Sequence, residues 1–165
     1  PPDRCYHCKK TIFTALMDRA AADGYTLMLD GTNASDDALD RPGMRALREF
    51  GVLSPLRICG LTKAEIRRRS RVLDLPTWGK PAYACLATRI PSGEIIDGDK
   101  LAKVEGAETA LLEMGYTDFR VRYFHGAARL QLPSAQWERA SSERRAIREA
   151  LQPWFTIVLL DMEER

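Results

Sequence analysis

The chain has 165 residues, a formal net charge of +2 and a hydrophobic fraction of 45%. This size gives room for one ordinary domain or two small ones, and the near-neutral charge excludes a polybasic arm of the kind that binds nucleic acid. No apolar run approaches the ~20 residues that span a bilayer, and the first residues lack the apolar centre of a signal peptide. We therefore expect a cytoplasmic protein without a membrane or nucleic-acid partner. The missing initiator Met is consistent with a chain that begins inside a longer gene product.

The first half of the chain alternates between helical and strand patterns. Apolar residues at helical spacing over residues 12–20 predict a helix that stops at Asp23 and Gly24. The elements expected after it are a strand at 25–29, a helix at 42–50, a strand at 56–59, and a helix at 63–73 that begins with a Thr62–Glu65 capping box. This alternation favours a parallel sheet with helices on its faces. Because two strands are too few for such a sheet, we interpret residues 1–91 as the second half of a doubly wound α/β domain.

A different order of elements follows the loop at residues 91–98. The expected elements are a helix at 101–112, an alternating strand at 119–123, a hairpin partner at 129–132, a helical region at 134–151 that breaks near 141–142, and a final strand at 155–160. Helix, strand, strand, helix and strand in this order are typical of a small α+β domain. We assign it residues 92–165.

The polar loop DGTN, which starts at Asp30, follows the first predicted strand. Ligands of α/β folds bind at the carboxyl ends of parallel strands, where this loop would lie. Asp36 and Asp37 could hold a Mg²⁺ ion that bridges phosphates, because hard cations take oxygen ligands. Taken alone, the loop is explained more simply by residues that form turns and helix caps.

Cys85 lies in the segment KPAYACLATRIPSG, between Lys80 and Arg89. A nearby cation favours the thiolate over the thiol, and a thiolate can serve as a nucleophile or a metal ligand. The alternative is a buried thiol that behaves as a small apolar side chain. Cys59 lies within an apolar predicted strand, and we assign it no chemical role.

Cys5 and Cys8 form a C-x-x-C pair near the start of the chain. A second such pair would indicate a closed structural zinc site, and the sequence has none; His7 and His125 could still complete a zinc site with mixed ligands. The thiolates of Cys5, Cys8 and Cys85 could instead hold three irons of a cubane cluster and leave the fourth iron open. Soft thiolate ligands suit either metal.

Arg120 and Arg122 share one face of a predicted strand, because side chains alternate along a strand. Two guanidinium groups on one face can bind a phosphate or a carboxylate, although a solvated outer face is equally consistent with the pattern. Glu108, near the apolar stripe of the preceding helix, could meet solvent or a metal ion.

Several segments, in one order, resemble the LarE family: RCYHCKK, DGTNASD, RPGMRAL, SPL, GLTKAEIR, KPAYACLATRIPSG and RVRYFHGAARL. The resemblance runs from Pro2 to about Leu132, and the combination of DGTNASD with ACLATR is specific. LarE proteins are ATP-dependent sulfur transferases. The resemblance implies an α/β fold in which residues 1–91 are the C-terminal half of a PP-loop (HUP-like, adenine nucleotide α-hydrolase) parallel sheet domain. Residues 92–165 would then form the small α+β domain for substrate binding and oligomerisation.

The resemblance also implies a reaction. ATP adenylates a carboxylate of pyridinium-3,5-biscarboxylic acid mononucleotide, and sulfur displaces AMP to give the thiocarboxylate used in the nickel-pincer nucleotide cofactor of lactate racemase. Cys5, Cys8 and Cys85 match the members that bind a 4Fe-4S cluster through three cysteines. In other members the residue that matches Cys85 gives up its own sulfur.

Residue roles follow from the same resemblance. We predict catalytic roles for Cys85, Arg120 and Arg122, and a metal- or phosphate-holding role for Glu108. Binding of ATP and Mg²⁺ is assigned to Asp30, Thr32, Asn33, Asp36 and Arg89. Gln131 stands where the family tends to have an acid.

The expected partners are the pyridinium mononucleotide, a sulfide or other sulfur donor, and further copies of the chain in a homo-oligomer. The family's SGGxDS phosphate loop is missing from these residues, so the chain as written could not bind ATP in the family manner by itself. Two alternatives stay open, namely a PP-loop enzyme that thiolates tRNA and a zinc-stabilised binding module.

Overall fold

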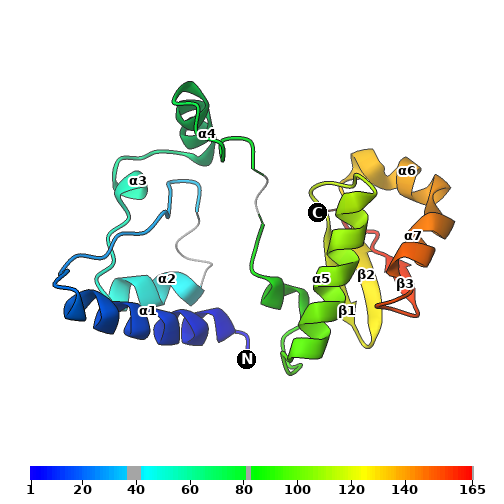
Figure 1. Cartoon of the computed structure of the whole chain (residues 1–165), viewed down its shortest axis with the longest axis horizontal. Coiled ribbons are helices and arrows are strands. Elements are labelled where there is room, and N and C mark those ends of the chain that lie inside the picture. The colour runs from blue at the N-terminus through cyan, green and yellow to red at the C-terminus, as the bar shows by residue number, and fades with distance from the viewer. Residues whose placement is uncertain (37–41, 81–82, 165) are drawn as a thin grey trace. The chain divides into compact units, whose positions relative to one another are not determined.

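The computed structural model describes residues 1–36, 42–80 and 83–164. They form two compact units, Pro1–Lys80 and Pro81–Arg165 (Figure 1). The division falls earlier in the chain than the junction after residue 91 that the sequence suggested. The reason is that Arg89, in the segment before that junction, makes a buried ion pair with Glu108 of the second unit.

The first unit is built on two packed helices, α1 (Arg4–Ala22) and α2 (Pro42–Glu49). The buried side chains between them are Met44 and Leu47, with Phe13 packed against them. The predictions of helices over residues 12–20 and 42–50 are confirmed. The first helix begins earlier than its apolar pattern, so the C-x-x-C pair lies inside its first turns.

The two strands expected in this unit do not form as predicted. The segment 25–29 makes a single parallel bridge, between Leu29 and Leu53. The prediction of a strand at 56–59 is wrong, because this segment is helix α3 (Pro55–Ile58). Pro55 is the reason: its fixed φ suits the first turn of a helix, where a missing N–H costs nothing. The half-sheet of a PP-loop domain therefore stays a prediction.

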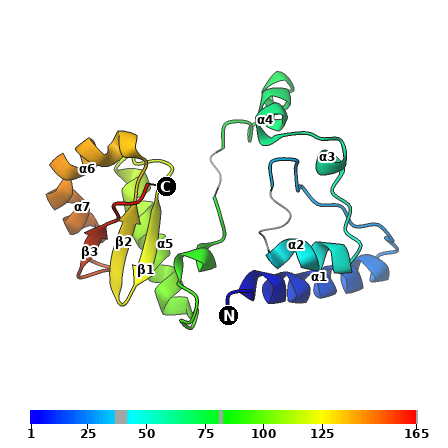
Figure 2. The ribbon, with the colours of Figure 1, turned by 180° about the vertical axis from the view of Figure 1, so that it is seen from behind.

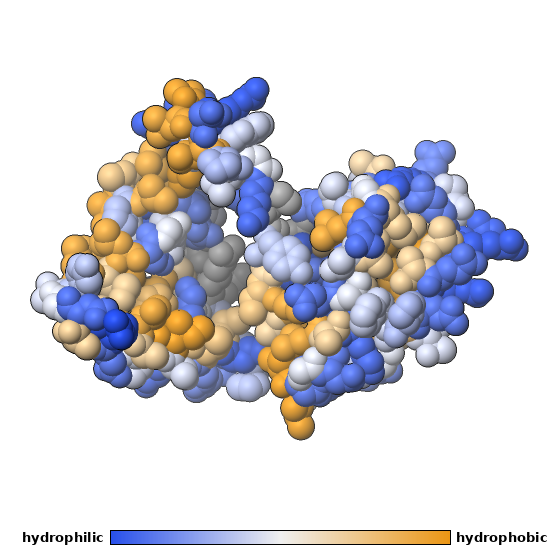
Figure 3. Space-filling model, viewed as in Figure 1, coloured by the Kyte–Doolittle hydropathy of each residue, from blue (hydrophilic) through white to orange (hydrophobic). Residues whose placement is uncertain are grey.

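Helix α4 (Lys63–Val72) begins as the sequence predicted. The Thr62 hydroxyl accepts a hydrogen bond from the backbone N–H of Glu65, and the Glu65 carboxylate accepts one from the backbone N–H of Thr62. The described residues of α4 include no buried side chain. Figure 3 shows hydrophobic side chains on the surface over this helix, where Val72 and Leu73 are 78% and 70% exposed.

The second unit is an α+β domain, as the sequence predicted. Helix α5 (Gly98–Glu113) precedes strands β1 (Arg120–Phe124) and β2 (Ala127–Gln131), which pair antiparallel. Helices η2 (Ser134–Gln136), α6 (Trp137–Ser142) and α7 (Arg144–Leu151) then lead to β3 (Val158–Leu160), which pairs parallel to β2. The strand order is β1-β2-β3.

Local geometry accounts for the hairpin of this sheet. His125 and Gly126 have φ values of 49° and 86°. A two-residue turn with positive φ at both positions matches the twist of antiparallel strands, and glycine reaches this conformation without strain. The turn sets the pairing of Arg122 with Arg129 and of Val121 with Leu130.

The core of the second unit lies on one face of the sheet. Val121 and Leu130 are buried there against Leu111 of α5 and against Ile147 and Leu151 of α7. Figure 2 shows α5 running beside β1 and the connection through α6 and α7 on the way to β3. Along the described residues, we find no helix that is both long and apolar enough to cross a bilayer.

Candidate functional site

A buried ion pair joins the short helix η1 (Leu86–Arg89) to α5. The side chains of Arg89 and Glu108 are 0% and 2% exposed. Arg89 donates from Nε to Oε1 of Glu108 at 2.7 Å and from Nη2 to Oε2 at 3.0 Å. Oε1 also accepts the backbone N–H of Val121 at 3.0 Å, and Oε2 accepts the Tyr83 hydroxyl at 2.9 Å. Glu108 therefore links η1, α5 and the edge of the sheet.

These contacts bear on two sequence-based assignments. Both oxygens of Glu108 already accept hydrogen bonds from protein donors, so a metal ion there would have to displace Arg89 or Val121. The Arg89 guanidinium is buried, and its Nη1 faces the carbonyl oxygen of Ala84 at 3.3 Å. The two residues hold the segment around Cys85 against the domain core. The metal role of Glu108 and the cofactor-binding role of Arg89 stay predictions.

Arginines gather beside this pair, on the face of the sheet opposite the core. Arg122 on β1 is paired directly with Arg129 on β2. Like charges directly opposite one another destabilise a sheet, so stability alone does not explain the arrangement. Burial lowers the pKa of Arg122 from its ordinary value, and the charges of Arg129 and Arg89 lower it further. The pKa of Arg120 is also lowered, by burial first and then by Arg89.

Polar partners set the geometry of this arginine cluster, which we define as Arg120, Arg122 and Arg129. Arg122 donates from Nε to the side-chain oxygen of Gln131 and from Nη1 to the backbone oxygen of Thr88 at 3.1 Å. Gln131 in turn donates to Oδ2 of Asp161 at 2.8 Å.

Arg129 has an ion-pair partner, but its Nε makes no hydrogen bond to another described residue. Its Nε lies 3.1 Å from Oδ2 of Asp161, which makes an ion pair. The same Nε is buried and has no hydrogen-bond partner among the described residues, because its N–H is not directed at that oxygen. Three arginines on one sheet face, two of them partly buried, can bind an anion such as phosphate or carboxylate.

Sequence reasoning missed four of the residues that complete the site. Arg129 belongs to the arginine cluster, and Tyr83, Thr88 and Asp161 contact that cluster or the buried ion pair. Tyr83 and Thr88 are in the segment around Cys85. Arg129 could have been found from the hairpin, because a two-residue turn at His125 and Gly126 pairs it with Arg122. Asp161, directly after the last apolar strand, gave no usable signal. Burial, and then the hydrogen bond to Glu108, raise the pKa of Tyr83.

Hydrogen bonds within the loop and from Ser54 order the loop predicted to bind ATP. Asp30 accepts from the Ser54 hydroxyl at 2.6 Å, and from the backbone N–H and the hydroxyl of Thr32. Burial alone would raise the pKa of Asp30, but the hydrogen bonds from Ser54 and Thr32 outweigh it, and the pKa lies below its ordinary value. Asp36 accepts from the side-chain amide of Asn33 at 2.8 Å and from its backbone N–H at 3.1 Å.

The structure thus brings Asp30 together with Thr32, and Asn33 with Asp36. Both pairs are typical of turns that order a loop. Asp37, the other acid considered for Mg²⁺, lies outside the described residues. The roles of the loop in binding ATP and Mg²⁺ stay predictions.

The four cysteines are divided between the two units. Cys5 and Cys8 are exposed, three residues apart on α1, so they share one helix face. Cys85 is exposed on the second unit, where it directly precedes η1. Its backbone oxygen accepts the Thr88 hydroxyl at 2.7 Å. Cys59 is exposed at the end of α3, not within a strand as predicted.

Over residues 1–36, 42–80 and 83–164, no group of three or more His, Cys, Asp or Glu side chains is arranged to hold a metal ion. His7, a candidate zinc ligand, lies 3.1 Å from Oδ2 of Asp3. The convergence of Cys5, Cys8 and Cys85 on one cluster stays a prediction.

The α+β unit with its arginine cluster has the features of a domain that binds a small anionic ligand. No family model matches the chain. The chain is 35% identical over 135 residues to the pyridinium-3,5-bisthiocarboxylic acid mononucleotide synthase of Lactiplantibacillus plantarum, a match that covers 82% of this chain and 49% of that protein.

Two uncharacterised proteins are also similar. One, from Synechocystis, is 39% identical over 167 residues, which cover 99% of this chain and 62% of that protein. The other, from Methanocaldococcus jannaschii, is 33% identical over 131 residues, which cover 79% of this chain and 51% of that protein. The chain thus spans about half the length of two of these curated relatives and somewhat more of the third.

Proposed function

We propose that the chain is part of a LarE-type sulfur transferase of the PP-loop class. It would act in nickel-pincer nucleotide synthesis and convert a pyridinium biscarboxylate mononucleotide to its thiocarboxylate form. Similarity to the L. plantarum synthase supports this role. A carboxylate is a poor electrophile, and adenylation by ATP would give it a good leaving group before sulfur attacks.

The arginine cluster is the observation that carries the proposal. The substrate bears a phosphate and carboxylates, which are the groups that guanidinium donors bind best. Arg120 and Arg122 are partly buried, so a phosphate held by them would be partly desolvated and its attraction to them strengthened. Arg129, which is paired with Arg122 across the hairpin and forms an ion pair with Asp161, adds positive charge beside them. The roles of Arg120 and Arg122 in this proposal are to bind and orient the mononucleotide.

The donor set also fits an iron-sulfur cluster. We propose that Cys5, Cys8 and Cys85 hold a 4Fe-4S cluster, because all three thiols are exposed and soft thiolates are its usual ligands. A cluster held by three cysteines would supply sulfur from an open iron without loss of a protein atom. ATP and Mg²⁺ would be further requirements of the reaction, with the Asp30 loop ordered beside them. A homo-oligomer in the cytoplasm stays our expectation.

Nucleotide binding tests the role of the arginine cluster. Calorimetry with the pyridinium biscarboxylate mononucleotide should give a dissociation constant that rises about tenfold or more in Arg120→Ala and Arg122→Ala, since each loses a charge-assisted contact. Arg68→Ala, which removes an exposed arginine of the first unit, is the matched control and should bind normally. Equal affinity in all four proteins would remove the arginine cluster from the substrate site.

Metal content tests the proposed cluster, and product formation tests the proposed reaction. Anaerobically purified protein should contain iron and sulfide, and Cys5→Ala or Cys85→Ala should lose both, whereas Cys59→Ala should keep them. Mass spectrometry of a reaction with ATP, the mononucleotide, a sulfide source and a protein that carries both this chain and the SGGxDS loop should detect replacement of carboxylate oxygen by sulfur. A polypeptide that is lighter by one sulfur after turnover would instead indicate the sacrificial route through Cys85. Tight, salt-sensitive binding of tRNA without turnover of the mononucleotide would favour the tRNA thiolation alternative.

A further inference from the structure

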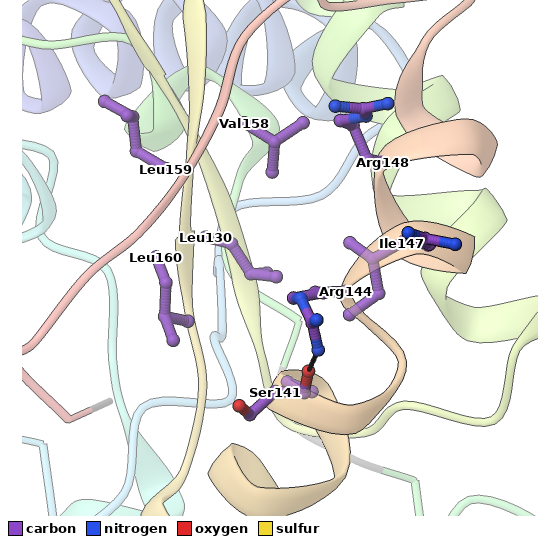
Figure 4. A pocket seen from close by; sticks show the side chains of 10 residues that line it. Leu130, Ser141, Arg144, Ile147, Arg148, Val158, Leu159 and Leu160 are labelled. Carbon is purple, nitrogen blue, oxygen red and sulfur yellow. Dashed lines mark hydrogen bonds between the residues drawn. The ribbon is translucent and has the colours of Figure 1, made fainter.

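A groove opens in the second unit between helices α6 and α7 and strands β2 and β3. Its volume is about 640 Å³. The close view in Figure 4 shows Ile147 of α7 facing Leu130 and Val158 across this space. Leu160 of β3, the register partner of Leu130, extends the apolar lining. Leu130 and Val158 lie on the sheet face opposite Arg129, so this groove is separate from the arginine cluster.

Three arginines of α7 border the groove: Arg144, Arg145 and Arg148. All three are exposed, and none makes an ion pair with another described residue. Arg144 donates to the backbone oxygen of Ser141 at 3.1 Å, a contact drawn in Figure 4. An apolar floor beside uncompensated positive charge is complementary to a ligand that is apolar on one side and acidic on the other.

The shape of the groove favours a polypeptide over a small molecule. Small-molecule pockets bury most of their ligand, whereas Leu160, the register partner of Leu130 on this face, stays 44% exposed. Arg144 and Arg148 are four residues apart on one helix, so their side chains lie one above the other at a spacing of about 6 Å. Acidic residues four apart on a second helix repeat at the same spacing.

We propose that this groove binds an amphipathic helix of a partner protein, with glutamates or aspartates facing the arginines of α7 and leucine-like side chains resting on Val158 and Leu160 of β3. Binding of this kind places an apolar helix face in a groove and fixes its direction by charges at the border. The inference does not depend on the proposed sulfur transferase activity, because it involves the other face of the sheet.

A designed peptide tests the proposal. The probe is a fluorescent helix of about 18 residues, or five turns, with leucines along one face and glutamates four apart beside them. A control peptide carries lysines in place of the glutamates. Fluorescence anisotropy with the whole chain should show saturable binding of the acidic peptide only, and its affinity should fall as salt screens the charges. Hydrogen exchange should slow in α7 and β3 on binding.

Charge-reversal variants identify the surface. Arg145→Glu and Arg148→Glu should each weaken binding about tenfold or more, and Arg68→Glu on α4 should not change it. These arginines are exposed, so unchanged circular dichroism is expected. Equal binding of the acidic and basic peptides, or insensitivity to both reversals, would overturn the proposal. Sedimentation of the chain alone tests whether the groove binds a second copy of the chain. A dimer that Arg145→Glu dissociates would assign the groove to that second copy instead of a partner protein.

Discussion

Replacing Glu108 with Gln tests whether the buried ion pair is structural. The substitution keeps the shape of the side chain but removes the charge that neutralises Arg89, and both side chains are almost fully buried. Each oxygen of Glu108 accepts two hydrogen bonds, from Arg89 and Val121 on one side and from Arg89 and Tyr83 on the other. The amide NH₂ group must therefore face donors wherever it is placed.

The expected loss is large for a unit of this size. Removing one partner of a buried ion pair costs about 3–5 kcal/mol, because the other charge stays buried without compensation. For a domain of about 60–100 residues, each kcal/mol lowers the melting temperature by about 4–8 °C. Glu108→Gln should therefore lower the melting temperature of the second unit by more than about 10 °C. Replacing both partners by apolar residues, Arg89→Met with Glu108→Leu, should recover most of this loss.

Thermal and urea unfolding of the whole chain, followed by circular dichroism, measures these changes. Asp99→Asn is the matched control, since it removes an exposed ion pair from the same helix and should leave the melting temperature unchanged. A loss below about 1 kcal/mol in Glu108→Gln, or a double variant whose loss equals the sum of the two single losses, would refute the reasoning. If Glu108 instead held a metal ion, millimolar Mg²⁺ or Mn²⁺ would stabilise the natural protein and not the variant.

Three further predictions concern pH and helix capping. Burial, and then the hydrogen bond to Glu143, raise the pKa of Tyr116 from 10.0 to about 12, so its stabilising effect is complete below pH 10 and is lost as the pH rises towards 12. The free energy of unfolding should fall by about 2–3 kcal/mol over this pH range, and Tyr116→Phe should make it nearly independent of pH there. An equal pH dependence of unfolding in both proteins would contradict the role of Tyr116. The lowered pKa of Asp30 predicts the opposite sign: its contribution is present above pH 3.8 and is lost as the pH falls below that value, and Asp30→Asn should abolish this part of the acid unfolding curve of the first unit. Thr62→Ala should cost α4 about 1 kcal/mol and speed amide exchange along that helix, because its described residues include no buried side chain to compensate; unchanged exchange would argue against the cap.

Much of the secondary structure could be predicted because it depends on neighbouring residues. The capping box at Thr62 starts α4 where expected, and the His125-Gly126 turn sets the hairpin and its register. Where two local signals compete, the prediction fails: the apolar run at 56–59 suggested a strand, but Pro55 begins a helix there. The α+β order of the second unit was predicted because each of its elements carries its own pattern.

The sequence by itself determined which chemical groups are available: four thiols, two arginines on one strand face and a loop of turn formers. Only the tertiary structure decided how they are used, because contacts between residues far apart in the chain leave no periodic signal. Arg89 and Glu108, 19 residues apart, form a buried ion pair with each other, whereas Arg122 and Arg129 are held face to face by the hairpin. Burial makes the difference: a charge pair removed from water is stable only when fully paired, and an incompletely paired cluster of one sign is stabilised by binding an anion.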